Sequence, residues 1–244
     1  MILTHKNQSV DLDLDLIKEN KKIGVSLSGG TDSALLFFLL CKFTPEIKIV
    51  PWCGIDLYRA AHILYAREIY LLMKERFPEV DIDPIHEFNI DVKDPVWVQR
   101  YQSDPNNENI PQSGRIKQMI CTYESRKLDS SGRVNMHINA LTANPPREEA
   151  KRLGFYDKCE ERRWPKDKVT KQSRYSYRPF RLVDKKWVAG MYEQFGLMEW
   201  LYPWTQSCVG FAEGTEHFTK PCGECFWCHE KKWAFGTMDL CFDL

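Results

Sequence analysis

A short segment near the N-terminus combines glycine, hydroxyl and carboxylate side chains, in the order Ser28-Gly29-Gly30-Thr31-Asp32-Ser33. An apolar run at residues 23–27 precedes it, and another at residues 34–40 follows it. This order predicts a strand, a tight glycine-rich turn and a helix. The backbone N–H groups of such a turn and the positive end of the helix dipole favour an anion such as a phosphate. We therefore predict a phosphate site, although not a P-loop, because no lysine follows the second glycine.

A second group of chemically active residues lies near the C-terminus and consists of four cysteines: Cys208, Cys222, Cys225 and Cys228. Two residues separate each of the last three thiols from the next, and Gly223 allows the tight turn of a metal knuckle. Four thiolates around a tetrahedral Zn²⁺ make a closed structural site. The alternatives to the favoured zinc site are His217 or His229 in place of Cys208, an iron–sulfur cluster, and no bound metal.

Composition limits the function classes. The 244 residues can form one large or two small domains, and their formal net charge is zero. A neutral chain has no global attraction to nucleic acid or to anionic membranes. No secretory signal is visible in residues 1–15, and the apolar run at 34–41 is too short to span a membrane. We expect a cytoplasmic protein, without membrane contact, whose five scattered cysteines are small buried hydrophobes.

The pattern of apolar residues predicts elements that could position these groups. Strands are expected at residues 47–50, within 80–90, at 134–138 and at 177–183, and helices at 57–77, 116–128 and 184–195. The last helix has Asp184 as its expected N-cap and Gly196 as its C-cap. This alternation predicts an α/β fold with a doubly wound parallel sheet of about five strands. Ligands of such sheets bind at the carboxyl end of the first strand, where residues 28–33 lie.

Two further segments show no clear periodicity. Residues 91–114 are predicted to be a long loop. Residues 160–181 are rich in arginine and lysine, interleaved with aromatic side chains. This basic segment could contact nucleic acid, close as a flap over ATP or a nucleotide-like substrate, or be a solvated loop. Neutral overall charge weighs against the first interpretation, so nucleic acid is not an expected partner.

The pattern S-G-G-x-D-S at residues 28–33 resembles the PP-loop of the ATP pyrophosphatases, which split ATP between its α and β phosphates. Together with the late cysteines, it makes the chain resemble the 7-cyano-7-deazaguanine synthase (QueC) family. The late match consists of Thr205-Gln206-Ser207-Cys208 and the C-G-x-C-x-x-C run at 222–228. This resemblance implies an adenine nucleotide alpha-hydrolase-like domain over residues 1–200, with a zinc-binding segment, 201–244, packed on it.

The resemblance also implies an AMP-forming ligase of queuosine biosynthesis. In that family a carboxylate such as 7-carboxy-7-deazaguanine attacks the α-phosphorus of ATP, and ammonia captures the adenylate to give an amide and then a nitrile. ATP and Mg²⁺ would be held by Ser28, Gly29, Gly30, Thr31, Asp32 and Ser33. Asp32 would hold Mg²⁺ or cap the helix. Arg115 would neutralise a phosphate or the carboxylate, or be a surface ion pair.

Residues 139–146 differ from the substrate segment of that family, so the acid that is used remains open. One alternative is a sulfur-transferring, tRNA-modifying PP-loop enzyme, for which Cys53 and Cys121 are the candidate catalytic pair. Another is a relative that binds ATP without turnover. Three histidines have no partner visible in the sequence and receive no role, namely His62, His86 and His137. The oligomeric state is left open, with a homodimer as one option.

Overall fold

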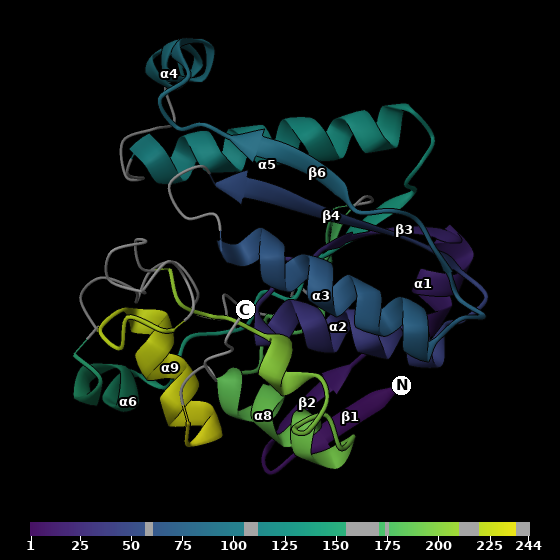
Figure 1. Cartoon of the computed structure of the whole chain (residues 1–244), viewed down its shortest axis with the longest axis vertical. Helices are drawn as coiled ribbons and strands as arrows, with labels where there is room; N and C mark the ends of the chain where they lie inside the picture. Colours follow the sequence, from purple (N-terminus) through teal and green to yellow (C-terminus); the bar gives the residue numbers. More distant parts are fainter. Residues whose placement is uncertain (57–60, 105–111, 155–170, 174–175, 210–219, 238–244) are drawn as a thin grey trace.

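The computed structural model describes residues 1–56, 61–104, 112–154, 171–173, 176–209 and 220–237 (Figure 1). Its main sheet has seven strands in the order β5-β4-β3-β7-β9-β8, with β6 paired to β4. These strands are β3 (Lys22–Ser26), β4 (Lys48–Asp56), β5 (Asp81–Ile82), β6 (His86–Ile90), β7 (Met136–Ile138), β8 (Lys171–Ser173) and β9 (Ser176–Tyr177). All pairs are parallel except β8 with β9. The predicted mainly parallel α/β sheet is confirmed, and it is larger than expected.

Helices cover both faces of this sheet (Figure 1). Their bounds are α1 (Leu14–Asn20), α2 (Thr31–Phe43), α3 (Ala61–Arg76), α4 (Pro95–Gln102), α5 (Gln112–Ser130), α6 (Arg147–Arg152), α8 (Lys185–Gln194) and α9 (Phe226–Phe235), with a 3-10 turn, η1 (Tyr202–Trp204). Helices α2 and α3 lie on one side of β4, and α5 lies on the other. Residues 34–41 of α2 are all buried, because sheet and helices surround α2. A helix enclosed in this way is apolar on every side.

The expected loop at residues 91–114 is wrong in part, because it contains α4. The side chain of Asp94 caps this helix by accepting a hydrogen bond from Val96 N at 2.8 Å, and Pro95 occupies the first turn. Trp97 of α4 then packs edge-on against Tyr123 of α5, with ring centroids 5.6 Å apart. A good cap, a proline at the first position and aromatic packing outweigh the polar composition that suggested a loop.

The strand expected at residues 177–183 is much shorter than predicted. β9 ends at Tyr177, and residues 179–182 form turns. Pro179 has no N–H group to continue a sheet ladder, which gives the physical reason. Asp184 is the N-cap of α8 as predicted, but the C-cap is Phe195, and Gly196 follows it with a φ of +64°.

A hairpin at the N-terminus has no counterpart among the predicted elements. It pairs β1 (Ile2–His5) with β2 (Gln8–Asp11), and it buries Leu3 and Val10. The hydroxyl of Tyr177 fastens the end of this hairpin to the sheet, because it donates to Asp11 O at 3.0 Å and accepts from Asp13 N at 3.1 Å.

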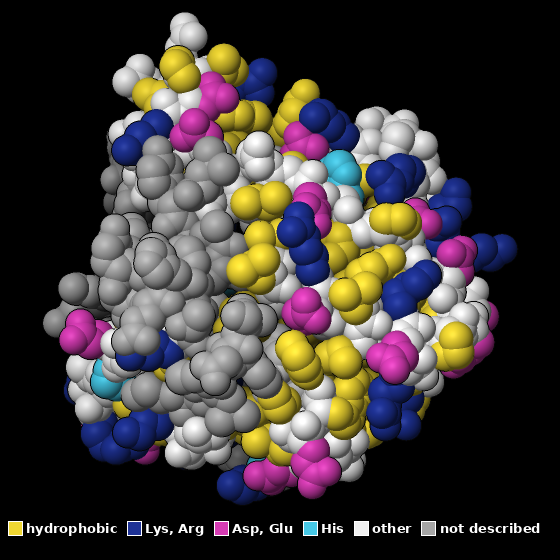
Figure 2. Space-filling model, in the orientation of Figure 1, with side chains coloured by type: hydrophobic (Ala, Val, Ile, Leu, Met, Phe, Trp, Pro, Cys, Tyr) yellow, Lys and Arg dark blue, Asp and Glu magenta, His cyan; other side chains and the backbone are white. Residues whose placement is uncertain are grey.

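On the side shown in Figure 2, Lys and Arg side chains alternate with Asp and Glu in the described part of the surface, in keeping with the zero net charge. Residues 160–170 and 174–175 of the basic segment lie outside the described residues. In the described part of the chain, no helix is long and apolar enough to cross a membrane.

The proposed boundary between residues 200 and 201 stays a prediction. Across it, Phe235 of α9 packs against Tyr192 of α8, with ring centroids 5.5 Å apart.

Candidate nucleotide site and cysteine centre

The glycine-rich segment joins the carboxyl end of β3 to the first turn of α2, as the sequence predicts. Gly29 has a φ of +76°, and a Cβ atom there would lie 2.6 Å from the carbonyl oxygen of His62. Only glycine fits this position without a shift of the backbone. Gly30 is the N-cap of α2 and provides no side-chain cap. The first N–H groups of α2 are therefore not used by a cap, which is the arrangement that binds anions at helix N-termini.

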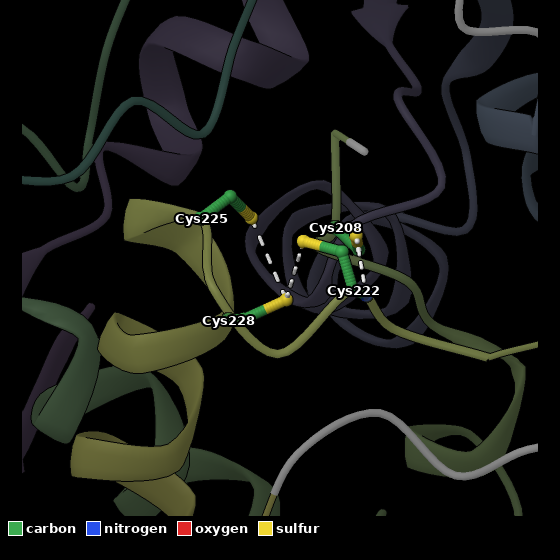
Figure 3. Close-up of side chains that lie close together, drawn as sticks. All are labelled: Cys208, Cys222, Cys225 and Cys228. Carbon is green, nitrogen blue, oxygen red and sulfur yellow. Dashed lines mark hydrogen bonds between the residues drawn. The ribbon is translucent and has the colours of Figure 1, made fainter. Parts of the chain in front are cut away.

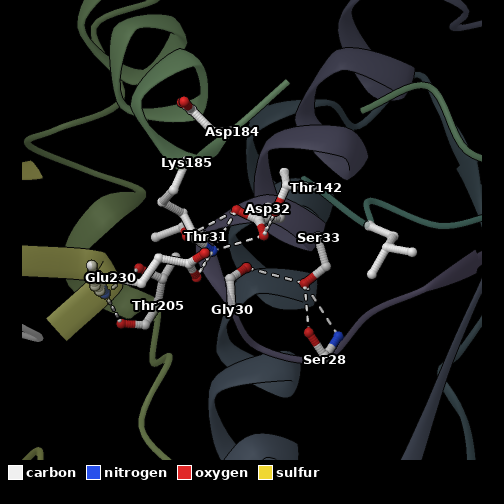
Figure 4. A network of polar contacts seen from close by, with 12 residues as sticks. Ser28, Gly30, Thr31, Asp32, Ser33, Thr142, Asp184, Lys185, Thr205 and Glu230 are labelled. Atoms are coloured by element: carbon white, nitrogen blue, oxygen red, sulfur yellow. Dashed lines mark hydrogen bonds and ion pairs between the residues drawn. The ribbon is translucent and has the colours of Figure 1, made fainter. Parts of the chain in front are cut away.

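The hydroxyl groups of Ser28 and Ser33 hold this loop together (Figure 4). Ser33 Oγ donates to Gly30 O at 3.0 Å, accepts from Ser28 N at 3.2 Å and lies 3.1 Å from Ser28 Oγ. Their contact with a phosphate stays a prediction. Their structural role is plain, since they fix the curvature of the backbone between strand and helix.

Asp32 contacts a residue from a distant part of the chain. Lys185 Nζ donates to both of its carboxylate oxygens, at 2.8 and 2.7 Å (Figure 4). Thr142 Oγ1 donates to Asp32 Oδ2 at 3.3 Å. Since Gly30 is the N-cap, the capping role considered for Asp32 is wrong. Asp32 is instead the centre of a polar contact between α2, α8 and the segment that follows β7.

Lys185 is a candidate site residue that the sequence analysis did not single out. It is the first residue of α8, and its side chain is only 5% exposed. A cation at a helix N-terminus opposes the helix dipole, so a nearby anion makes this position more favourable. The positive charge of Lys185 at the positive end of α8 was the signal in the sequence that could have pointed to this residue. It suggests a carboxylate nearby but does not identify which one.

Two consecutive charged residues of α9 are completely buried, Glu230 and Lys231. Glu230 Oε2 lies 3.8 Å from Lys185 Nζ. Lys231 Nζ donates to Thr205 O at 2.9 Å and to Thr205 Oγ1 at 3.1 Å, and it lies 4.5 Å from the centre of the Tyr202 ring. Buried charges are costly unless they are paired. The positive Lys185 thus lies near two negative residues, Asp32 and Glu230. These ion pairs join α2, α8 and α9.

The segment before the first late cysteine lies against the glycine-rich loop. Gln206 N donates to Gly29 O at 2.8 Å, and residues 205–208 are all buried. His62 Nδ1 lies 3.0 Å from Ser28 O, and loss of hydration lowers the pKa of His62. His62 received no role from the sequence, yet it packs on this loop from α3.

The four late cysteines come together as predicted. The ligand atoms of Cys208, Cys222, Cys225 and Cys228 all lie within 4.8 Å of one another (Figure 3). Cys225 and Cys228 belong to the N-cap and first turn of α9, whereas Cys222 lies before it. Cys222 N also donates to Cys208 Sγ at 3.3 Å. In the described residues, His229 is not part of this group, and His217 lies outside them.

The sulfur spacing fits a single tetrahedral ion. Cys228 Sγ lies 3.5 Å from Cys225 Sγ and 3.9 Å from Cys222 Sγ. Thiolates bound to one Zn²⁺ at its usual bond length stand about 3.8 Å apart. An iron–sulfur cluster carries its thiolates on separate irons and so needs them farther apart. The donor set and its compactness therefore favour zinc over a cluster.

Arg115, the sequence candidate for charge neutralisation, lies on α5 and forms an ion pair with Asp104 at 2.8 Å. None of its described contacts joins it to the glycine-rich loop, and its role toward a phosphate stays a prediction.

His137 Nε2 lies 2.9 Å from Asp129 Oδ1, and His86 Nε2 lies 3.3 Å from Glu124 Oε2. Two of the scattered cysteines, Cys41 and Cys53, are buried as expected, and Cys121 is half-buried.

Comparison with known proteins finds distant similarities to solved structures. No protein-family model and no curated protein matches the chain. An NMN synthetase from Francisella tularensis is 13% identical, with a TM-score of 0.47, and the match covers 93% of this chain and 82% of that one. A U34-tRNA thiolase from Methanococcus maripaludis, solved with its [4Fe-4S] cluster, is 14% identical, with a TM-score of 0.43 and coverages of 92% and 79%. Likenesses this distant do not decide an activity.

Replacement of Cys225 by serine tests the metal centre. A weaker fourth ligand should lower both the metal bound per chain and the melting temperature, because the centre ties α9 to residues 205–208. Metal analysis of the purified wild-type protein should find zinc, and a brown protein with iron in excess would contradict this assignment. Cys41→Ser, outside the centre, is the control and should leave the metal content unchanged.

Proposed function

We propose that this chain is an ATP-using enzyme that adenylates a small carboxylic acid, releases pyrophosphate and passes the acyl group to ammonia. The observation that supports this most is the Lys185–Asp32 ion pair at the glycine-rich loop, 2.7 Å long. It places a cation and a carboxylate beside a row of N–H groups at the start of α2. Backbone N–H groups at a helix N-terminus and a nearby cation favour a polyphosphate, and the carboxylate can hold its Mg²⁺.

Each group has a separate part in the proposed reaction. The first N–H groups of α2 and its dipole bind the oxygens of the phosphates. Asp32 is a suitable ligand for Mg²⁺, which when bound neutralises phosphate charge. Lys185, held at the same point, stabilises the charge that develops on the departing pyrophosphate. These groups are positioned by packing before substrate arrives, so little reorganisation is needed.

The acid is proposed to bind beside the segment after β7. Thr142 in this segment donates to Asp32, and Ala143 N donates to Val183 O at 2.8 Å just before α8. The segment therefore lies between the carboxylate of the nucleotide site and the start of α8. A deazapurine acid such as 7-carboxy-7-deazaguanine is the first candidate, from the resemblance of the loop and the cysteine pattern to the QueC family.

The direct test measures AMP and pyrophosphate release from ATP with 7-carboxy-7-deazaguanine and ammonia. We expect release that depends on the acid, and an amide or nitrile product by mass spectrometry. A panel of other small carboxylic acids should be run in parallel, because residues 139–146 differ from the family pattern. Binding of ATP without AMP release from any acid would contradict an enzyme and would support a nucleotide-binding relative.

Replacement of Asp32 by asparagine should lower turnover by about two orders of magnitude or more, because it removes charge from the phosphate site. Asp15→Asn, an exposed position in the first turn of α1, is the matched control and should behave as the wild type. Initial rates of pyrophosphate release measure the effect. Unchanged turnover in Asp32→Asn, with the fold intact, would overturn the assignment of this site.

Sulfur transfer to tRNA is the second candidate. The observation that favours it is that the cysteine centre lies close to the glycine-rich loop. Gln206 contacts this loop and is two residues from Cys208. The candidate catalytic pair fits it less well. Burial raises the pKa of Cys53 to about 12, and it also raises the pKa of Cys121. A sulfur nucleophile requires the thiolate, which these surroundings oppose.

Replacement of Cys121 by alanine separates the two candidates. For the adenylating enzyme we expect rates of AMP release within about twofold of the wild type, since the change is small and away from the site. At pH 7.5 a thiol reagent should modify Cys53 and Cys121 slowly in the folded protein, as protonated thiols react poorly. Loss of activity in Cys121→Ala with an unchanged melting temperature would instead favour sulfur transfer.

A further inference from the structure

Two buried charged residues of α9 make contacts that connect the cysteine centre with the proposed nucleotide site. One runs through Glu230 to Lys185, and the other through Lys231 to Thr205. Both residues follow Cys228 within three positions on α9. A fully buried carboxylate and ammonium in one helical turn are rare, because each is costly to remove from water.

We propose that Glu230 is a positioning residue, which holds the ammonium group of Lys185 at the nucleotide site and so couples that site to the cysteine centre. The inference rests on the proposed nucleotide site but not on the chemical reaction. Glu230 does not contact the glycine-rich loop in any described interaction. It acts through Lys185, whose Nζ lies between Glu230 Oε2 at 3.8 Å and the carboxylate of Asp32 at 2.7 Å (Figure 4).

The charges explain why a second carboxylate is useful here. With Asp32 alone, Lys185 would form a closed ion pair, and a nucleotide–Mg²⁺ complex would have to break it to use either group. With Glu230 on its other side, the ammonium group of Lys185 keeps a negative neighbour even when the Asp32 carboxylate rotates away to bind Mg²⁺. Lys185 is then held at the loop in both states, and its charge remains available to a phosphate.

The same residues place the cysteine centre within reach of this contact. Cys228 and Glu230 are on the first two turns of α9, so the position of that helix sets the position of the Glu230 carboxylate. Lys231 fixes Thr205, and Gln206 in turn donates to Gly29. Filling of the metal centre and binding of nucleotide should therefore strengthen each other, and by thermodynamic linkage the effect must be reciprocal.

The test is Glu230→Gln, which removes the charge and keeps the shape. Calorimetry should show Mg–ATP binding about 10- to 100-fold weaker than in the wild type, the usual cost of losing a group that orients a functional residue. Metal per chain should be unchanged. Glu193→Gln is the matched control, an exposed carboxylate on the same helix as Lys185. Wild-type affinity in Glu230→Gln, or loss of metal from it, would overturn the proposal.

A second measurement uses the wild-type protein and does not depend on the folding of a Glu230 variant. In the wild type, Mg–ATP should slow the loss of metal from the cysteine centre to a chelator. In Lys185→Met it should not. This variant is the control for metal that free nucleotide takes up in solution, because that uptake is the same in both samples. Equal loss with and without Mg–ATP in the wild type would contradict the coupling. A wild-type chain that binds no Mg–ATP would overturn the nucleotide site itself, whereas normal binding in Glu230→Gln overturns only the role of Glu230.

Discussion

The ion pair between Lys185 and Asp32 is the interaction on which the arrangement of this site depends. It joins residues separated by 153 positions, and the lysine side chain is only 5% exposed. Burying one of these charges alone would cost several kcal/mol. The pair is tolerable because Glu230 and Thr142 supply further partners, and because the N-terminus of α2 adds favourable potential for the carboxylate. Each partner comes from a different element, so the site exists only when all of them are in place.

The scaffold keeps these elements together with ordinary apolar packing. α2 is enclosed on every side, and Tyr192 of α8 donates its hydroxyl to Thr31 O at 2.9 Å. Tyr192, Tyr202 and Phe235 then form an aromatic group between α8, η1 and α9. This group carries the helix with the cysteines against the helix with Lys185. Packing of this kind is rigid, because interiors are close-packed and side chains have few alternative arrangements.

The cysteine centre is placed so that it could serve two roles in this arrangement. As a closed site with four sulfur donors, it fits a structural ion. It also lies beside the glycine-rich loop, since Gln206 contacts Gly29 and residues 205–208 are buried. A metal bound by these cysteines would therefore also order the segment that lies against the glycine-rich loop. Sequence-based reasoning assigned the centre only to stability, because spacing along the chain carries no information about what lies beside it.

The sequence by itself determined the features that depend on local order. The strand–turn–helix at residues 22–43, the cap at Asp184 and the grouping of Cys222, Cys225 and Cys228 all follow from neighbours along the chain. Their physics is local, since turns, caps and metal knuckles use backbone and side-chain groups a few residues apart. The short helix α4 and the end of β9 were missed because caps and proline outweighed composition over a few residues.

Only the tertiary structure decided which distant charges meet. Nothing in the sequence around Asp32, Lys185 and Glu230 indicates that these three residues meet, and a lysine at the start of a helix does not name its partner. Long-range electrostatic partners depend on how α2, α8 and α9 pack, and that packing is set by the buried aromatic and aliphatic side chains between them. For this reason the strand, glycine-rich turn and helix could be predicted from the sequence, whereas the charged residues that lie against the turn could not.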